Sequence, residues 1–267
     1  MPASYTTLKN EDYGLIHIDD LDDTIKDKIR TSLSKICHGI SKSTTDRALY
    51  SYKETLKEFI KRYNLKTEDT KKGMIGELLS HIFILDVFPN FKTVSPYFNL
   101  EERSIKKGFD LVLYSQESND IWITEVKSGE QHKNKTSNKT NKVLLDKAKN
   151  DLKERLNEDN STLWENAING ATISLEKYSD MKDAVNHILG DISDSVVKKE
   201  QTSDDKNVVL ISSLFTSLSD RIVESSVQEC HTKYIDDKIF NNVLILSIQK
   251  ATYQKVIDFL VEESADP

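Results

Sequence analysis

Apolar residues near the start of the chain recur at helical spacing. Over residues 22–36 they are separated by four, four and three positions, which places them on one face of a helix. A second stripe of this kind runs through residues 44–63, where Thr44 or Thr45 is available as the N-cap. The polar segment that follows marks a soft boundary, so we expect residues 1–66 to form a helical N-terminal region.

The pattern changes in the middle of the chain. A third helix is predicted over residues 68–88, and Pro89 stops it. Three strand-like runs follow, FKTVSPYFNL, GFDLVLY and IWITEVK, and turn-rich pieces join them. A long lysine-rich helix is then expected at residues 141–157.

Two strongly apolar runs in the last third predict buried strands. They are NVVLISSLF (207–215) and NNVLILSIQ (241–249), with one predicted helix between them and another closing the chain. Runs of Val, Ile and Leu that alternate with helices are typical of a sheet covered on both faces. We therefore predict an α/β fold in which helices flank a mixed sheet, preceded by the helical N-terminal region.

Composition narrows the class of protein. The 267 residues are 37% hydrophobic and 30% charged, as in soluble globular proteins. The longest apolar stretches are too short to span a bilayer, and the first residues lack the layout of a secretion signal. Cys37 and Cys230 form no local pair motif, so no disulfide framework or zinc ribbon is predicted. A reducing cytoplasm is the expected location.

Charge is unevenly distributed along the chain. The net charge is −7, which argues against a protein that coats nucleic acid through bulk charge. Residues 127–149 nevertheless hold seven lysines and only two acids. They could form a solvated helix face, but lysines also bind phosphate backbones without regard to sequence. We prefer the second interpretation and predict DNA contacts by Lys133, Lys135, Lys139 and Lys142.

The strand-like runs carry charges where packing residues are expected. Strand side chains alternate between faces, so Glu125 and Lys127 point the same way, roughly 7 Å apart. If the run holding Asp110 is the hairpin neighbour, its carboxylate reaches the same face and end of the sheet. Such a cluster is costly unless each charge is paired or solvated. The alternative is a solvated edge strand whose charges discourage aggregation.

A hard divalent cation would offset that cost. Asp110 and Glu125, helped by the backbone carbonyl of Val126, offer the oxygen ligands that Mg²⁺ prefers, with Mn²⁺ as a substitute. Lys127 would hold an attacking water and neutralise charge that develops on a phosphate. These residues predict a metal-dependent site for phosphodiester hydrolysis.

The same residues resemble a known family. Asp110 followed fifteen positions later by Glu125-Val126-Lys127 is similar to the motif of the PD-(D/E)xK nuclease superfamily, whose members are Mg²⁺-dependent phosphodiesterases that mostly cut DNA. The resemblance covers roughly residues 68–160. It implies a restriction-endonuclease-like sheet within a nuclease-like domain, which we expect over residues 67–267.

The leading helix extends this resemblance. Glu77 in GELL matches the acid that the superfamily places on this helix, which implies a role as an outer ligand or a water-orienting group. A surface glutamate is the competing interpretation. His81, one turn later, is more simply a packed residue. The chain departs from the motif at Phe109, because the superfamily usually has proline before the aspartate.

More loosely, the layout of the whole chain is similar to the HamA family of Hachiman anti-phage defence. The likeness lies in a helical first third, the GELL helix and the GFD…EVK segment. It implies DNA degradation during phage infection together with a partner helicase. Two other functions stay open: a catalytically silent module that binds DNA or a partner protein, and a purely structural subunit.

Overall fold

The computed structural model describes residues 5–98, 108–158 and 161–265. Its centre is a seven-stranded mixed sheet with the order β1-β2-β7-β6-β5-β4-β3. The strands are β1 (Tyr5–Lys9), β2 (Tyr13–Ile18), β3 (Phe91–Thr93), β4 (Leu111–Ser115), β5 (Asp120–Glu130), β6 (Asn207–Phe215) and β7 (Asn242–Lys250). The four strands β2, β7, β6 and β5 are parallel, and β1, β4 and β3 are antiparallel to their neighbours.

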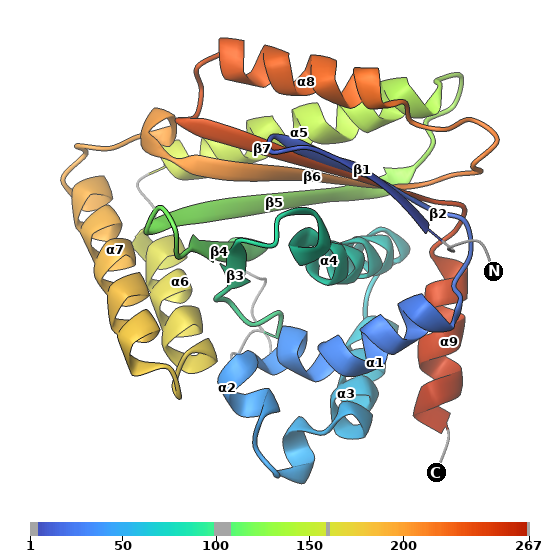
Figure 1. The fold of residues 1–267 in the computed structure, drawn as a ribbon, viewed down its shortest axis with the longest axis horizontal. Coiled ribbons are helices and arrows are strands. Elements are labelled where there is room, and N and C mark those ends of the chain that lie inside the picture. The colour runs from blue at the N-terminus through green and yellow to red at the C-terminus, as the bar shows by residue number, and fades with distance from the viewer. Residues whose placement is uncertain (1–4, 99–107, 159–160, 266–267) are drawn as a thin grey trace.

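Helices cover both faces of this sheet (Figure 1). On one face lie α5 and α8, and on the other lies α4, with α1, α3 and α9 packed outside it; α6 and α7 form a pair beside the β4 side of the sheet. The helices are α1 (Asp23–His38), α2 (Ile40–Ser43), α3 (Tyr52–Asn64), α4 (Glu68–Val87), α5 (Ser137–Asn157), α6 (Ser161–Ser174), α7 (Ser179–Val197), α8 (Glu224–Asp236) and α9 (Gln254–Ala265), with short 3₁₀ turns η1 (Ala48–Tyr50) and η2 (Ser203–Asp205).

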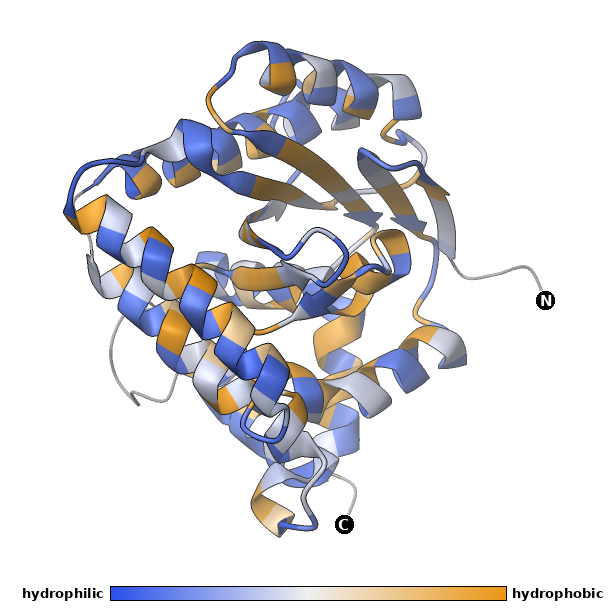
Figure 2. Ribbon diagram, turned by 60° about the vertical axis from the view of Figure 1, so that its left-hand side comes forward, coloured by the Kyte–Doolittle hydropathy of each residue, from blue (hydrophilic) through white to orange (hydrophobic). Residues whose placement is uncertain are grey.

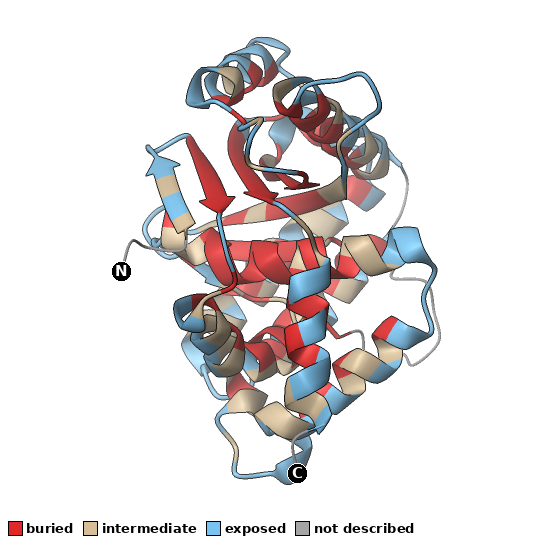
Figure 3. Ribbon diagram, turned by 90° about the vertical axis from the view of Figure 1, so that its right-hand side faces the viewer, coloured by how far each residue is buried: buried red, intermediate tan, exposed pale blue. Residues whose placement is uncertain are grey.

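The sheet separates two hydrophobic cores. Successive residues of a strand face opposite sides, so Ile123 and Leu210 pack under α5 while Val126 and Ile211 pack under α4. The apolar strands stand out in Figure 2. Most residues of α4 from Met74 onward are buried (Figure 3), because this helix lies between the sheet and an outer layer of helices. In the described part of the chain, no helix combines the length and apolarity needed to cross a membrane.

Most of the predicted elements are confirmed. The α/β class, the mixed sheet, the flanking helices and both late strands are present, and Cys37 and Cys230 are buried free thiols. The strand predicted at 91–100 is shorter, since only β3 forms there, and its last two positions lie outside the described residues. The lysine-rich helix begins earlier than expected, at Ser137.

The prediction for the first 66 residues was partly wrong. Residues 5–18 form β1 and β2 rather than helix, because β2 finds its parallel partner in β7 at the other end of the sequence. The cap of α3 also differs. Ser51, rather than Thr44 or Thr45, accepts the Glu54 N–H, and the residues before it form η1. The division at residue 66 stays a prediction.

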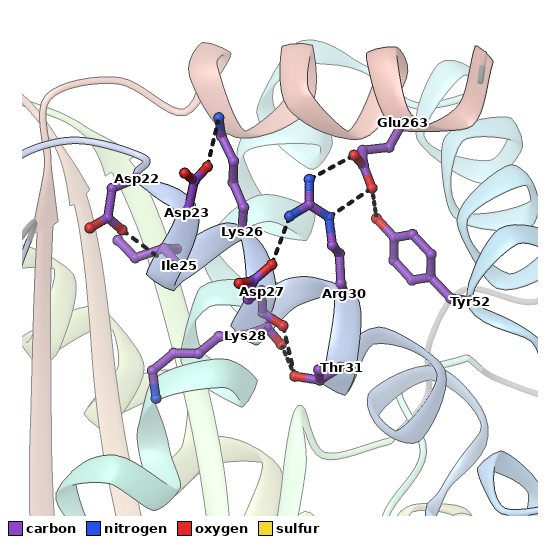
Figure 4. A network of polar contacts seen from close by, with 10 residues as sticks. All are labelled: Asp22, Asp23, Ile25, Lys26, Asp27, Lys28, Arg30, Thr31, Tyr52 and Glu263. Atoms are coloured by element: carbon purple, nitrogen blue, oxygen red, sulfur yellow. Dashed lines mark hydrogen bonds and ion pairs between the residues drawn. The ribbon is translucent and has the colours of Figure 1, made fainter.

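The outer helices are joined by a cluster of charged residues (Figure 4). Arg30 on α1 donates hydrogen bonds of 3.0 and 2.8 Å to the two carboxylate oxygens of Glu263 on α9. Tyr52 on α3 donates a third hydrogen bond, of 3.1 Å, to the same carboxylate. A bidentate pair of this kind fixes orientation as well as distance. It therefore holds α1, α3 and α9 in one layer beneath α4.

The contact between α4 and the sheet depends on a glycine. A Cβ atom added to Gly76 would lie 1.7 Å from the Ser128 hydroxyl, 2.7 Å from the Ser128 Cβ and 3.1 Å from the Ser213 Cβ. Ser128 and Ser213 are register partners on β5 and β6, so α4 crosses the sheet at its closest where all three residues are small.

This contact predicts a position-specific effect of alanine on stability. Gly76→Ala should lower the free energy of unfolding by about 1–3 kcal/mol, because helix and sheet must separate to admit the methyl group. Gly73→Ala in the same helix, where an added Cβ meets nothing within 4 Å, should instead raise it by up to about 1 kcal/mol through helix propensity. Urea unfolding followed by circular dichroism measures both, and equal effects would contradict the packing argument.

Candidate active site

The candidate site lies where β4 and β5 part. Their pairing ends at Leu111 and Thr124, while β5 continues to Glu130 alongside β6. Asp110 directly precedes β4, and its Oδ2 accepts the Val126 N–H at 2.7 Å. A carboxylate thus takes the place of the backbone acceptor that a longer β4 would have supplied. This hydrogen bond places Asp110 beside Glu125.

Glu125 is a buried carboxylate with two cationic partners. It is 3% exposed, and it accepts hydrogen bonds from Lys127 Nζ at 2.7 Å and from Arg155 Nη1 at 2.6 Å. Burial raises the pKa of Glu125 to about 7, and the nearby charge of Asp110 adds to this rise, while Arg155 and Lys127 oppose it. The two acids therefore lie close enough for each to feel the other's charge.

Lys127 lies between two carboxylates. Its Nζ is 2.7 Å from Glu125 Oε1 and 2.8 Å from Asp151 Oδ2. Burial alone would lower the pKa of Lys127, but the charges of Glu125 and Asp151 outweigh burial and raise the pKa above its ordinary value. Lys127 is consequently a protonated ammonium near neutral pH, held in a defined place.

Two site residues on α5 were missed from the sequence. Asp151 bonds Lys127, and Arg155 bonds Glu125 and also donates from Nη2 to the carbonyl of Gly108. Their i, i+4 spacing puts both on one face of the helix. The only signal was this pair of opposite charges in the helix after the charged strand, and such pairs are common on solvated helices.

Val126 takes part through its backbone. Its side chain faces the opposite side of the sheet, in the core beneath α4. The N–H and C=O of one strand residue point to the same neighbour, and the Val126 N–H points to Asp110. The Val126 carbonyl therefore points to the same side of β5 as Asp110, and its role as a metal ligand stays a prediction.

Glu77 lies on the other face of the sheet, where α4 packs. It is half-buried on α4, whereas the Glu125 and Lys127 side chains point toward α5. Burial raises the pKa of Tyr97 well above its ordinary value, and the charges of Glu77 and then Asp110 add to that rise. The charges of both acids therefore act on the Tyr97 hydroxyl. His81 packs edge-on against the same ring, with centroids 5.6 Å apart.

The four predicted DNA-binding lysines lie apart from this cluster. Lys133, Lys135, Lys139 and Lys142 are all exposed, in the loop after β5 and the first turns of α5. Asp151 lies twelve residues after Lys139 on the same helix, a separation of about 18 Å along its axis. Helix α5 thus joins Lys139 and Lys142 to the site, whereas Lys133 and Lys135 lie in the loop before this helix.

The donor set suits a hard cation that keeps much of its own water. Among the described residues, no group of three or more His, Cys, Asp and Glu side chains is arranged to hold a metal ion. Asp110, Glu125 and the Val126 carbonyl provide only two carboxylates and a peptide oxygen. Mg²⁺ is usually bound by one or two carboxylates together with waters and substrate phosphate, so these residues fit Mg²⁺ better than Zn²⁺ or Ca²⁺.

Comparison with known proteins adds a match over nearly the whole chain. A family model described as HamA matches residues 4–263. A search among curated proteins finds no match. The matched range includes every residue of the candidate site.

The charge cluster predicts a large loss of stability when its buried acid is removed. Glu125→Ala should lower the free energy of unfolding by about 3 kcal/mol, because it leaves two half-buried cations short of a partner. Glu154→Ala, at an exposed position of α5, should change it by less than about 0.5 kcal/mol. Chemical denaturation measures both values. If the two variants proved equally stable, Glu125 would not hold the cluster together.

Proposed function

The chain belongs to the HamA family of Hachiman anti-phage defence, and we propose that it is a Mg²⁺-dependent nuclease that hydrolyses DNA phosphodiesters in the cytoplasm together with a helicase partner. The observation that carries the proposal is the meeting of Asp110, Glu125 and Lys127 where β4 and β5 part. Two acids beside the start of β4 offer oxygen ligands for a metal ion, and an ammonium next to them offers charge stabilisation for a phosphate.

In this proposal Asp110, Glu125 and the Val126 carbonyl hold Mg²⁺, or Mn²⁺ in its place. The bound ion would supply Lewis-acid polarisation of the scissile phosphate. Each carboxylate oxygen has more than one lone pair, so a hydrogen bond from Lys127 or Arg155 does not prevent Glu125 from acting as a ligand.

Lys127 acts as the catalytic cation. Its raised pKa keeps it protonated near neutral pH, so it stabilises negative charge that develops on the phosphate and orients an attacking water by donating hydrogen bonds. Glu77 acts from the opposite face, as an outer acid near Tyr97 that orients water beside Asp110.

DNA would follow α5 away from the reacting centre. The separation of about 18 Å between Lys139 and Asp151 equals about five nucleotide steps of 3.4 Å along one strand. Lys133, Lys135 and Lys142 would extend this contact. With a net charge of −7, intrinsic DNA affinity is expected to be weak, which favours delivery of DNA by the helicase.

One observation favours a different function. Both carboxylate oxygens of Glu125 already bind protein cations, and Arg155 lies 2.6 Å from one of them. If that pairing persists in the presence of metal, the domain is a catalytically silent module that binds DNA or a partner protein.

Metal removal and two substitutions test the proposed reaction. With Mg²⁺ the protein should cut supercoiled plasmid, alone or with the helicase of the same defence system, and EDTA should abolish cutting. Lys127→Ala should lower the rate by about 100-fold or more, and Asp110→Asn should do the same while its amide oxygen still accepts the Val126 N–H. Lys147→Ala, at an exposed position of α5, is the matched control. Failure to cut under every condition would support the silent module.

The lysines should contribute to DNA affinity through phosphate contacts. In an Asp110→Asn background, replacing both Lys139 and Lys142 with Gln should weaken binding and reduce the slope of log affinity against log salt by about 0.9 per lost contact. Fluorescence anisotropy at several salt concentrations measures the slope. The matched control replaces Lys57 and Lys61 on α3, and an identical slope in the two variants would exclude the predicted path.

A further inference from the structure

Two charged side chains of α5, those of Asp151 and Arg155, contact the candidate site. We infer that Asp151 and Arg155 are positioning residues: Asp151 aims the ammonium of Lys127, and Arg155 holds the carboxylate of Glu125 beside the segment that leads into Asp110. This inference rests on the proposed nuclease function and names two further residues on which that function depends.

Asp151 settles where the Lys127 ammonium lies. A lysine side chain is long and flexible, so one contact with Glu125 would leave its end free to swing. The second contact, 2.8 Å to Asp151 Oδ2, fixes Nζ between a strand residue and a helix residue. Asp151 is itself 39% exposed and stands at the solvent side of the site, where substrate would arrive.

Arg155 joins the two acid-bearing segments. One arm of its guanidinium donates to Glu125 on β5, and the other donates to the Gly108 carbonyl, two residues before Asp110. The centre of the Arg155 guanidinium lies 5.6 Å from the ring centroid of Phe109, the residue that stands between Gly108 and Asp110 in the sequence. The planar fork of arginine serves two acceptors at once, which the single ammonium of lysine does not match.

Asp151 and Arg155 form their ion pairs with side chains of β5. Opposite charges at i and i+4 of an exposed helix commonly pair with each other, yet Asp151 and Arg155 each bond a side chain of β5. The helix that carries them is firmly seated, because Leu144, Leu145, Ala148, Leu152 and Leu156 are buried against the sheet. Catalytic groups need support from rigid elements of this kind.

The test compares conservative variants with neighbours on the same helix. Arg155→Lys keeps the charge but loses one arm, and Asp151→Asn keeps the shape but loses the charge. Exposed Lys153→Gln and Glu154→Gln are the controls. Calorimetry measures Mg²⁺ affinity of the full chain, and plasmid cleavage with the helicase separates kcat from KM.

The two variants should fail in different ways. Arg155→Lys should weaken Mg²⁺ binding by about 10-fold or more, as expected when the support of a metal ligand is lost. Asp151→Asn should leave Mg²⁺ affinity and KM within about 2-fold and lower kcat by about 10–100-fold, because it acts only through Lys127. A merely structural role would shift the thermal midpoint without this division.

The outcomes separate the inference from the proposed function. If the wild type cuts DNA and Asp110→Asn does not, while Asp151→Asn and Arg155→Lys match their controls, the positioning inference is wrong and the nuclease stands. If the wild type with its helicase neither binds Mg²⁺ nor cuts, both are wrong. Because Asp151 is partly exposed, Asp151→Asn is expected to fold, so this variant decides the matter even if Arg155→Lys unfolds.

Discussion

The site depends on one hydrogen bond, from the Val126 N–H to the carboxylate of Asp110. Strand β4 pairs with β5 only as far as Leu111, and a buried N–H left without an acceptor would cost as much as a lost hydrogen bond. Asp110 provides that acceptor as a side chain. The same interaction therefore ends the strand pairing, satisfies the backbone and brings a second carboxylate up to Glu125.

Helices pack on both faces of the sheet where β4 and β5 part. On one face the leucines of α5 pack on β5 and β6, and Asp151 and Arg155 bond Lys127 and Glu125. On the other, α4 lies close because Gly76, Ser128 and Ser213 are small. Burial between these layers raises the pKa of Glu125. The acids around Lys127 raise the pKa of its ammonium, which stays positive. A shift of α5 would therefore change the charged partners of Glu125 and Lys127.

Local patterns predicted what local geometry determines. Alternation along a strand was enough to put Glu125 and Lys127 on one face, and hairpin adjacency was enough to bring Asp110 to them. Partners far apart in sequence could not be found in this way. The run YGLIHI lies inside the sheet because β7, from the far end of the sequence, pairs with it on the side away from β1, and Arg155 is indistinguishable in sequence from an arginine on any solvated helix. Glu77 was assigned to the site by resemblance, and the structure places it on α4, on the face of the sheet opposite to the Glu125 and Lys127 side chains.

The order of strands also bears on how the protein is made. Tyr13 on β2 lies in register with Ile245 on β7, and β5 gains its parallel neighbour only with β6. During synthesis from the N-terminus, Asp110, Glu125 and Lys127 thus emerge long before the strands that complete their sheet. A chain interrupted before residue 207 would hold Asp110, Glu125 and Lys127 on a sheet that lacks β6 and β7, so the charged cluster would gain its full support only after residue 250 has been made.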